Sequence, residues 1–350
     1  MVVPPWYELP PPGYGGLEQV CAALVDALVD RGHDVTLFGA GSGSGTRASF
    51  VGSAPAPAAD RVGQVLPELA HLARVNQMLA DERFDVVHDH TTAGVLFARH
   101  RPAPTVLTVH NRPTGELADV LTDVDPSAGL VAISHAQRRL RPELSWIDVV
   151  HNGMVGNLPV KARPGIGPVL WLARYAPDKG PDLAIHACRA AGLPLVLAGK
   201  CNEPVEEEYL HRVIEPMVGP DVTLLRNPDR QTCVDLLLAA RCLIMPVRWE
   251  EPFGMAMLEA MATGTPVVAL NRGAVPELIN HGETGLICDD PVDLAPALRD
   301  VSAIEPENCV SHVRRWFSAE RMAEGYERVY RAWSSDRRPE LALSRSAWVP

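Results

Sequence analysis

Residues 241–270 read RCLIMPVRWEEPFGMAMLEAMATGTPVVAL and contain two short apolar runs with a longer segment between them. The runs RCLIMP (241–246) and PVVAL (266–270) have the length and composition of buried strands. Pro252 suits the first turn of a helix, so we expect the intervening segment to be helical. A strand, a helix and a second strand in this order are typical of parallel strands connected by a crossover helix.

The same alternation recurs along most of the chain. It predicts two sets of about five strands each, and therefore an α/β protein with two Rossmann-like, doubly wound parallel sheets. The expected strands of the first half are 34–39, 84–90, 104–110, 129–134 and 147–152. Those of the second half are 168–173, 194–199, 221–225, 241–246 and 266–270.

The length of 350 residues favours two domains of roughly 150 residues each. The stretch NGMVGNLPVKARPGIGP (152–168) is rich in glycine and proline and has no periodicity, so we expect a hinge-like linker there. The expected parts are a first domain at 1–160, a second domain at 161–310, a helix at 311–334 that packs back on the first domain, and a flexible tail at 335–350.

Two further segments differ from the strand and helix alternation. Residues 39–60 are rich in glycine, serine, alanine and proline, and we expect a flexible insertion after a strand. Residues 316–333 predict a strongly amphipathic helix with aromatic anchors at Phe317, Tyr326 and Tyr330.

Composition excludes several classes of protein. The net charge is -11 and no basic run reaches five residues, which argues against nucleic acid as a partner. The seven cysteines are scattered without closely spaced pairs, as expected for free thiols in a reducing compartment. No signal peptide and no apolar run of membrane-spanning length is apparent, so we expect a cytoplasmic protein, with peripheral membrane contact left open.

Glycines and cations follow several of the expected strands or precede helices. Gly13, Gly15 and Gly16 precede a helix whose backbone N–H groups suit a phosphate, although the same glycines suit an ordinary turn. Arg174 and Lys179 follow one strand, and Gly199 with Lys200 follows the next. These cations suit the developing charge of a leaving diphosphate, and they equally suit a solvated loop.

The histidines are weaker signals. His88 and His90 lie on the same side of a strand, but no third ligand at a suitable spacing is apparent, so we expect no metal and no cofactor. His110 ends an expected strand at its carboxyl end, where ligands of open parallel sheets bind, and we expect it to contact substrate.

Glu251 and Glu259 flank the start of the expected helix. With Glu251 just outside the helix and Glu259 about two turns inside, the two carboxylates would lie about 12 Å apart along the axis, at about 1.5 Å per residue. A retaining glycosidase needs its two carboxyl groups about 5 Å apart. The spacing therefore favours two acids that hold different parts of one extended ligand.

Together these motifs resemble the family-four glycosyltransferases of the GT-B fold, which are retaining enzymes that use nucleotide sugars. The resemblance covers residues 4 to about 333, and the glutamate pair with PFG is its most specific part. The motifs that carry it are PPPGYGGLEQV, RGHDVTLFG, FDVVHDH, TVHN, AISHAQRR, VVHNGM, LARYAPDKGPDLAI, LAGK, EEPFGMAMLEAMATGTPVVA, GAVPELINHGETGLI and FSAERMAEGYERVY.

The resemblance implies a role for each matching residue. Glu251 would bind hydroxyls of the donor hexose and Glu259 those of the ribose, while Arg174 and Lys179 would hold the diphosphate and His110 would line the sugar pocket. The first domain would face the acceptor, and the second would bind the donor across a central crevice. The implied donor-binding positions are Gly15, Gly16, Gly199, Lys200, Arg226, Asn227, Phe253, Gly254, Met255, Ala256 and Glu259.

The implied function is transfer of a hexose from a UDP-glucose or GDP-mannose type of donor by a front-face mechanism to an acceptor that the sequence does not identify. An epimerase or phosphorylase on the same fold, and a non-catalytic donor-binding subunit, stay as alternatives. Three departures from the family pattern leave details open: only MVV precedes Pro4, Arg226 stands where relatives usually have glycine, and Asn111 follows His110.

Overall fold

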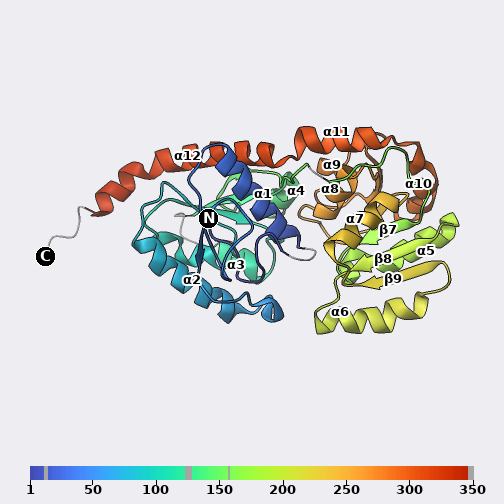
Figure 1. Ribbon diagram of the computed structural model, residues 1–350, viewed down its shortest axis with the longest axis horizontal. Helices are drawn as coiled ribbons and strands as arrows, with labels where there is room; N and C mark the ends of the chain where they lie inside the picture. The colour runs from blue at the N-terminus through green and yellow to red at the C-terminus, as the bar shows by residue number, and fades with distance from the viewer. Residues whose placement is uncertain (12–14, 123–127, 157, 346–350) are drawn as a thin grey trace. The chain divides into compact units, whose positions relative to one another are not determined.

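The computed structural model describes residues 1–11, 15–122, 128–156 and 158–345, and the chain forms two compact α/β units (Figure 1). Unit 1 consists of residues 1–11, 17–153 and 319–350, and unit 2 consists of residues 12–16 and 154–318. Unit 1 is therefore built from both ends of the chain. The change of unit after Gly153 falls within the glycine- and proline-rich linker.

The sheet of unit 1 is parallel. Val2 bridges Phe38 on one side and Asp89 on the other, so the short segment at residues 1–3 joins strands β1 and β3. The sheet winds outward from this segment in both directions, as in a doubly wound fold. The strands are β1 (Thr36–Gly39), β2 (Ser49–Gly52), β3 (Val87–Asp89), β4 (Thr105–Val109), β5 (Ala128–Ala132) and β6 (Trp146–Val149).

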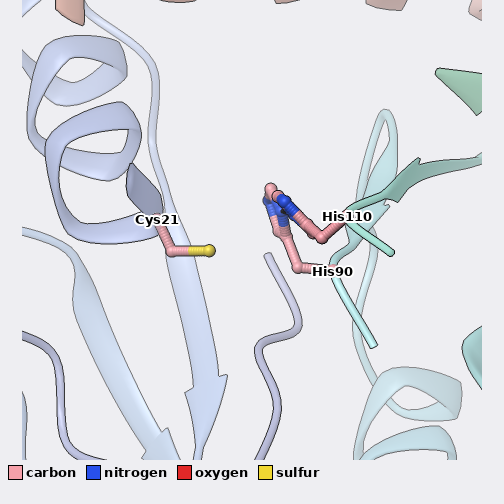
Figure 2. A group of neighbouring side chains, drawn as sticks. All are labelled: Cys21, His90 and His110. Atoms are coloured by element: carbon pink, nitrogen blue, oxygen red, sulfur yellow. Dashed lines mark hydrogen bonds between the residues drawn. The ribbon is translucent and has the colours of Figure 1, made fainter. Parts of the chain in front are cut away.

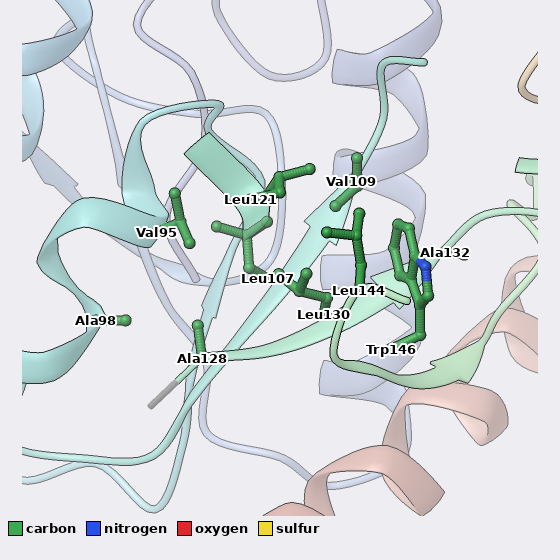
Figure 3. Packing of buried hydrophobic residues seen from close by; sticks show 10 residues of the cluster. All are labelled: Val95, Ala98, Leu107, Val109, Leu121, Ala128, Leu130, Ala132, Leu144 and Trp146. Atoms are coloured by element: carbon green, nitrogen blue, oxygen red, sulfur yellow. The ribbon is translucent and has the colours of Figure 1, made fainter. Parts of the chain in front are cut away.

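Helices cover this sheet because their apolar faces are buried against it. Figure 3 shows one cluster, in which Leu107, Leu130 and Trp146 of three neighbouring strands pack with Leu121 of α3. Each fully buried leucine or valine contributes about 1.5–3 kcal/mol relative to an exposed one. The helices are α1 (Gly16–Asp30), α2 (Val65–Ala80), α3 (Glu116–Thr122), α4 (His135–Leu140) and α12 (Ala319–Arg345).

The sheet of unit 2 is also parallel, with the order β12-β11-β10-β7-β8-β9. The chain moves from β7 outward through β8 and β9, then returns to the other side of β7 to start β10. This reversal is the topological switch point, where ligands of open α/β sheets bind. The strands are β7 (Val169–Leu172), β8 (Leu195–Gly199), β9 (Val222–Arg226), β10 (Leu243–Met245), β11 (Val267–Leu270) and β12 (Gly285–Cys288).

The helices of unit 2 follow its strands in the alternating order that the sequence predicts. A 3₁₀ turn, Pro177–Lys179, precedes the first of them. The helices are α5 (Pro181–Ala191), α6 (Pro204–Tyr209), α7 (Arg230–Ala239), α8 (Met255–Ala262), α9 (Val275–Leu278), α10 (Leu294–Asp300) and α11 (Pro306–Trp316).

All ten expected strands are present, and the differences lie elsewhere. The segment 39–60, expected to be a flexible insertion, contains β2, which pairs with β1. The expected helix at 316–333 is interrupted, because α11 ends at Trp316 and α12 begins at Ala319. Helix α12 then continues to Arg345, where the sequence predicts a flexible tail from residue 335.

No helix among the described residues has both the length and the apolar composition needed to cross a bilayer. The longest of them, α12, carries many charged residues. All seven cysteines are free thiols, and all are buried.

Candidate active site

The switch point of unit 2 brings together the segments that follow β7 and β10. Arg174 and Lys179 come after β7, and Glu251 comes after β10. Since β7 and β10 are hydrogen-bonded neighbours, the ends of both strands open at the same edge of the sheet. Two cations and an acid expected from the sequence therefore lie on adjacent loops.

Lys179, Trp249 and Glu251 form a part-buried cluster on these loops. The Nζ atom of Lys179 donates to Oε2 of Glu251 at 2.6 Å, and the indole N–H of Trp249 donates to the same oxygen at 2.9 Å. The Lys179 ammonium also lies 4.4 Å from the centre of the Trp249 ring. The side chains of Lys179 and Glu251 are 12% and 9% exposed, so their charges interact in a medium that screens them poorly.

Glycines fix the backbone around Glu251. Gly273 has a φ of +58°, and a Cβ at that position would lie 2.2 Å from the carbonyl oxygen of Glu251. Gly254 has a φ of +101°, and a Cβ there would lie 3.5 Å from Cγ of Glu251. Glycine adopts such backbone angles without steric cost. The close approach of the two chain segments therefore requires glycine at Gly273, and the turn before α8 favours it at Gly254.

Helix α8 begins at Met255 and not at Pro252, so the expected separation of the two acids needs correction. Pro252 and Phe253 belong to the loop that Gly254 ends, and Glu259 is the fifth residue of the helix, little more than one turn inside. Within the described chain no side chain caps the start of α8. The first N–H groups of this helix, at Met255 and Ala256, are therefore suited to an anion.

Glu259 is buried within α8 and lies near a cation from another helix. Glu259 is 5% exposed, and its Oε1 lies 3.7 Å from Nη1 of Arg230, the first residue of α7. Burial raises the pKa of the Glu259 carboxyl to about 7, although Arg230 opposes this shift. A buried carboxyl with a displaced pKa is a frequent feature of ligand sites.

Arg174 pairs with a different acid from Lys179. Its guanidinium donates to Oε1 of Glu206 at 2.9 Å, and Glu206 is 3% exposed while Arg174 is 45% exposed. Glu206 also accepts the backbone N–H of Glu203 as part of a capping box at α6. Arg174 is thus paired, with much of its side chain open to solvent.

The ends of β8 and β9 carry the next expected residues. A Cβ on Gly199 would lie 1.7 Å from the carbonyl oxygen of Ala173, so no other residue fits there. Lys200 directly follows Gly199, at the carboxyl end of β8.

Arg226 and Asn227 lie at the end of β9 and directly after it. The guanidinium of Arg226 lies 3.4 Å from Oε1 of Glu207, and Asn227 has a φ of +50°. Asparagine tolerates this left-handed conformation better than most residues. Asn227 also accepts the backbone N–H of Cys201 at 2.9 Å, which ties the two loops together.

The remaining expected residues lie at other places in the chain. Gly16 is the first residue of α1, and Gly15 directly precedes it. Gly13 lies outside the described residues. His110 follows β4 in unit 1, and its Nε2 lies 2.9 Å from Nδ1 of His90. Burial lowers the pKa of the His110 imidazole to about 3, so the ring is neutral at physiological pH.

Four residues of this site were not expected from the sequence: Trp249, Glu206, Arg230 and Gly273. Trp249 has a local signal, because it stands two residues before Glu251 on the same loop. Gly273 belongs to a quoted motif but is separated from Glu251 by α8 and β11. Glu206 and Arg230 lack any such signal, because they lie in the first turns of α6 and α7 and their roles depend on side-chain contacts with residues distant in the sequence.

Comparisons with known proteins agree with this architecture. Residues 14–154 match the family described as Glycosyltransferase Family 4, and residues 168–314 match Glycosyl transferases group 1. The glycogen synthase of Mycobacterium tuberculosis (strain ATCC 25618 / H37Rv) is 27% identical over 354 residues, covering 84% of each chain.

Solved structures give the same result. AviGT4, a glycosyltransferase involved in avilamycin A biosynthesis, has a TM-score of 0.71 and 24% identity, covering 95% of this chain and 97% of its own. Anabaena Alr3699/HepE in complex with UDP-glucose has a TM-score of 0.70 and 18% identity, covering 95% and 99%. The fold therefore defines a glycosyltransferase of the GT-B class. Within that class, the chain belongs to the family-4 glycosyltransferases.

Proposed function

We propose that this enzyme transfers a hexose from a nucleoside-diphosphate sugar to a hydroxyl-bearing acceptor, with retention of the anomeric configuration. The observation that carries the proposal is the part-buried contact of Lys179 with Glu251 beside the start of α8, which no described side chain caps. An ammonium and the N–H groups of a helix start suit a diphosphate, and a carboxylate suits sugar hydroxyls. A nucleotide sugar presents both kinds of group within one molecule.

The contacts of Glu251 support an exchange of partners when the donor binds. The hydrogen bonds described for its side chain both fall on Oε2, from Lys179 and from Trp249. A diphosphate carries more negative charge than one carboxylate, so Lys179 is expected to donate to the phosphate instead. Trp249 would then hold Glu251 in place while the carboxylate accepts hydrogen bonds from the hexose.

Arg174 and Glu259 would hold the rest of the donor. The side chain of Arg174 is 45% exposed, so it can turn from Glu206 toward the diphosphate without leaving a packed environment. The buried carboxyl of Glu259 would accept hydrogen bonds from the two ribose hydroxyls. Gly199, Lys200, Arg226 and Asn227, at the carboxyl ends of β8 and β9, would contribute to the same part of the donor site.

The proposed reaction is a front-face displacement. The bond between the anomeric carbon and the phosphate oxygen breaks, and a bond to the acceptor oxygen forms on the same face of the sugar. The acceptor's proton passes to the departing phosphate. Stabilisation of that leaving group by Lys179 and the α8 start is then the main contribution to the rate, and His110 is proposed to contact the sugar. No step uses a metal ion, so transfer is expected to continue in the presence of a chelator.

UDP-hexoses are the first donors to test, because a structural neighbour was solved with UDP-glucose. We propose measuring the melting temperature with UDP, GDP, ADP and their glucose and mannose derivatives at saturating concentration. A ligand at 100 times its Kd stabilises by about 2.7 kcal/mol, which is readily detected. Stabilisation by one nucleotide series supports the proposal, and a melting temperature unchanged by all of them would overturn it.

Retention is tested separately from donor binding. Many transferases slowly hydrolyse their donor, and NMR of the hexose first released shows its anomeric configuration. Release of the same anomer as in the donor supports the front-face reaction. Release of the opposite anomer would contradict it while leaving donor binding intact. The free thiols fit the reducing cytoplasm proposed as the location of this reaction.

A further inference from the structure

Unit 1 contains a compact group of three potential metal ligands. Cys21 lies on α1, His90 directly follows β3, and His110 directly follows β4. One ligand atom from each of them, the thiol sulfur and a ring nitrogen of each histidine, lies within 4.8 Å of the others. Figure 2 shows the Cys21 side chain directed toward the two imidazole rings.

The fold explains why these residues meet. Strands β3 and β4 are parallel neighbours, so His90 and His110 leave the sheet at the same edge. Their rings are stacked with centres 5.2 Å apart, and Nδ1 of His90 lies 2.9 Å from Nε2 of His110. Cys21 is fully buried on the helix that faces them. Spacing in the sequence gives no sign of this third ligand, because Cys21 lies 69 positions before His90 in the chain.

The distances are close to those of a zinc site. Tetrahedral Zn²⁺ binds sulfur at about 2.3 Å and nitrogen at about 2.0–2.1 Å, which places neighbouring ligand atoms roughly 3–4 Å apart. The ligand atoms lie at most 4.8 Å from one another. Side-chain movements of about 1 Å would therefore bring them to the distances of a zinc site. Such movements need no change in the backbone of α1, β3 or β4.

One of these ligands has an unused nitrogen. His90 is 3% exposed, and its Nε2 has no hydrogen-bond partner among the described residues. A buried polar atom without a partner costs about 1–3 kcal/mol. The Nδ1 atom of the same ring lies 2.9 Å from Nε2 of His110, and this contact has to open when both imidazoles bind one ion, because the two nitrogens of a ring point in different directions.

We propose that Cys21, His90 and His110 form a binding site for one Zn²⁺ ion, with the fourth position open to water. One thiolate and two imidazoles match the ligand preference of zinc and disfavour Mg²⁺ and Ca²⁺, which prefer oxygen. On binding, the S–H bond of Cys21 breaks, a Zn–S bond forms, and one proton passes to solvent. All three ligands belong to unit 1, whereas Lys179, Glu251 and Glu259 belong to unit 2.

This binding has a consequence for transfer that rests on the proposed function. His110 is proposed to contact the sugar, and an ion bound to its imidazole would prevent that contact. Zinc is therefore expected to inhibit transfer reversibly, while a chelator restores the activity.

Binding is tested without any assay of activity. The full chain is stripped with a chelator and titrated with Zn²⁺ by calorimetry in two buffers of different ionisation enthalpy. One ion per chain and release of about one proton are expected. Co²⁺ as a probe is expected to give a sulfur-to-cobalt charge-transfer band in the near ultraviolet.

Variants identify the ligands. Cys21→Ser and Cys21→Ala should each remove the charge-transfer band and weaken Zn²⁺ binding by about 100-fold or more, beyond the loss typical of an outer-shell residue. His90→Gln should weaken it similarly. The matched control is Cys188→Ala, another buried helical cysteine, which should bind Zn²⁺ like the native chain. Circular dichroism verifies that each variant is folded.

Two results would overturn the site: a native affinity no higher than that of folded Cys21→Ala, or a charge-transfer band that persists in it. Cys21→Ser should also retain basal transfer and lose zinc inhibition. Stoichiometric binding without inhibition would support the metal site and contradict the role of His110 in transfer, so the two proposals fail separately.

Discussion

At the residue scale, the site of unit 2 consists of charged side chains whose partners differ. Glu251 is bound by Lys179 and Trp249, whereas Glu259 lies one turn inside α8 near Arg230. The two carboxylates therefore have different surroundings on one short stretch of chain. We expect them to contribute to different parts of donor binding.

Substituting the two acids should separate transfer from nucleotide affinity. Glu251→Ala is expected to lower kcat by about 10²–10³-fold, as for loss of one group that stabilises a transition state, while the Kd for the nucleoside diphosphate changes little. Glu259→Ala is expected to weaken the nucleoside diphosphate by roughly 10–100-fold, because hydrogen bonds to charged groups contribute about 1.5–3 kcal/mol. Initial rates and calorimetry measure the two effects, and an equal loss of nucleotide affinity in both variants would contradict this division.

The buried carboxyl of Glu259 should also affect stability. Its pKa is raised from 4.5 to about 7, so the folded state binds more protons than the unfolded state between these values. The contribution of Glu259 is thus most favourable below pH 4.5 and is lost as the pH rises through about 7, by up to about 3 kcal/mol. Glu259→Gln should lack this decline. The melting temperature of both proteins from pH 5 to 8 measures it, and parallel curves would argue against a protonated Glu259.

Much of this site could be predicted from the sequence. Lys179 and Glu251 follow strands that the apolar runs identify, and neighbouring parallel strands bring their carboxyl ends together. The pairing of Arg174 with Glu206 could not be predicted, because it depends on how a side chain of a loop and a side chain of α6 are oriented. Cys21 could not be predicted as a neighbour of His90 and His110 either, because it lies on α1, far from both histidines in the sequence.

At the element scale, the loop before α8 depends on close backbone packing. Gly273, in the turn before α9, has backbone contacts with Glu251 that leave no room for a side chain. Its N–H also donates to Oε2 of Glu250 at 2.8 Å. The position of Glu251 therefore depends on a turn that follows the next strand.

Gly273→Ala should displace this loop and reduce transfer together with stability. The matched control is Gly282→Ala, since Gly282 has a φ of +84° but open space where a Cβ would lie. Both variants incur the backbone cost of alanine at positive φ, roughly 1 kcal/mol. Only Gly273→Ala is expected to lower kcat and the affinity for the donor. Kinetics alongside thermal unfolding measure this, and identical behaviour of the two variants would count against steric support of Glu251.

The two unexpected strands show why some elements escape prediction. β2 has the sequence SFVG within a segment rich in glycine, serine and proline, and β12 has the sequence GLIC. The first position of β12 requires glycine, because a Cβ on Gly285 would lie 2.3 Å from the carbonyl oxygen of Val267. Glycine normally weakens a strand, so a tertiary contact here overrides the local preference.

At the scale of the whole molecule, unit 1 is completed by helix α12 from the end of the chain (Figure 1). The hydroxyl of Tyr330 lies 2.6 Å from Nδ1 of His88, and that of Tyr326 lies 2.8 Å from Oγ1 of Thr108. Glu327 accepts two hydrogen bonds from Arg31, which directly follows α1, at 2.7 and 3.0 Å. These contacts attach α12 to β3, to β4 and to the end of α1.

Glu327 should stabilise unit 1 in a pH-dependent way. The hydrogen bond from Arg31, with the contacts of His33 and Arg331, lowers the pKa of the Glu327 carboxyl from 4.5 to about 2. Its stabilisation is therefore present above pH 4.5 and is lost as the pH falls through about 2. Glu327→Gln should lower the melting temperature at pH 7 by more than Glu324→Gln does. The ion pair of Glu324 with Arg31 is exposed, and such pairs contribute little to stability. Calorimetric scans from pH 7 to 3 measure both, and a deficit that grows toward pH 3 would contradict this account.

The division of unit 1 between the two ends of the chain has a consequence for its synthesis. Residues 154–318 of unit 2 are contiguous and leave the ribosome before α12 does. Domains usually fold in the order in which they are translated. Here we expect the order of completion to be reversed. Unit 2 can fold while the chain is still growing. The sheet of unit 1 keeps the surface that binds α12 uncovered until that helix has been synthesised.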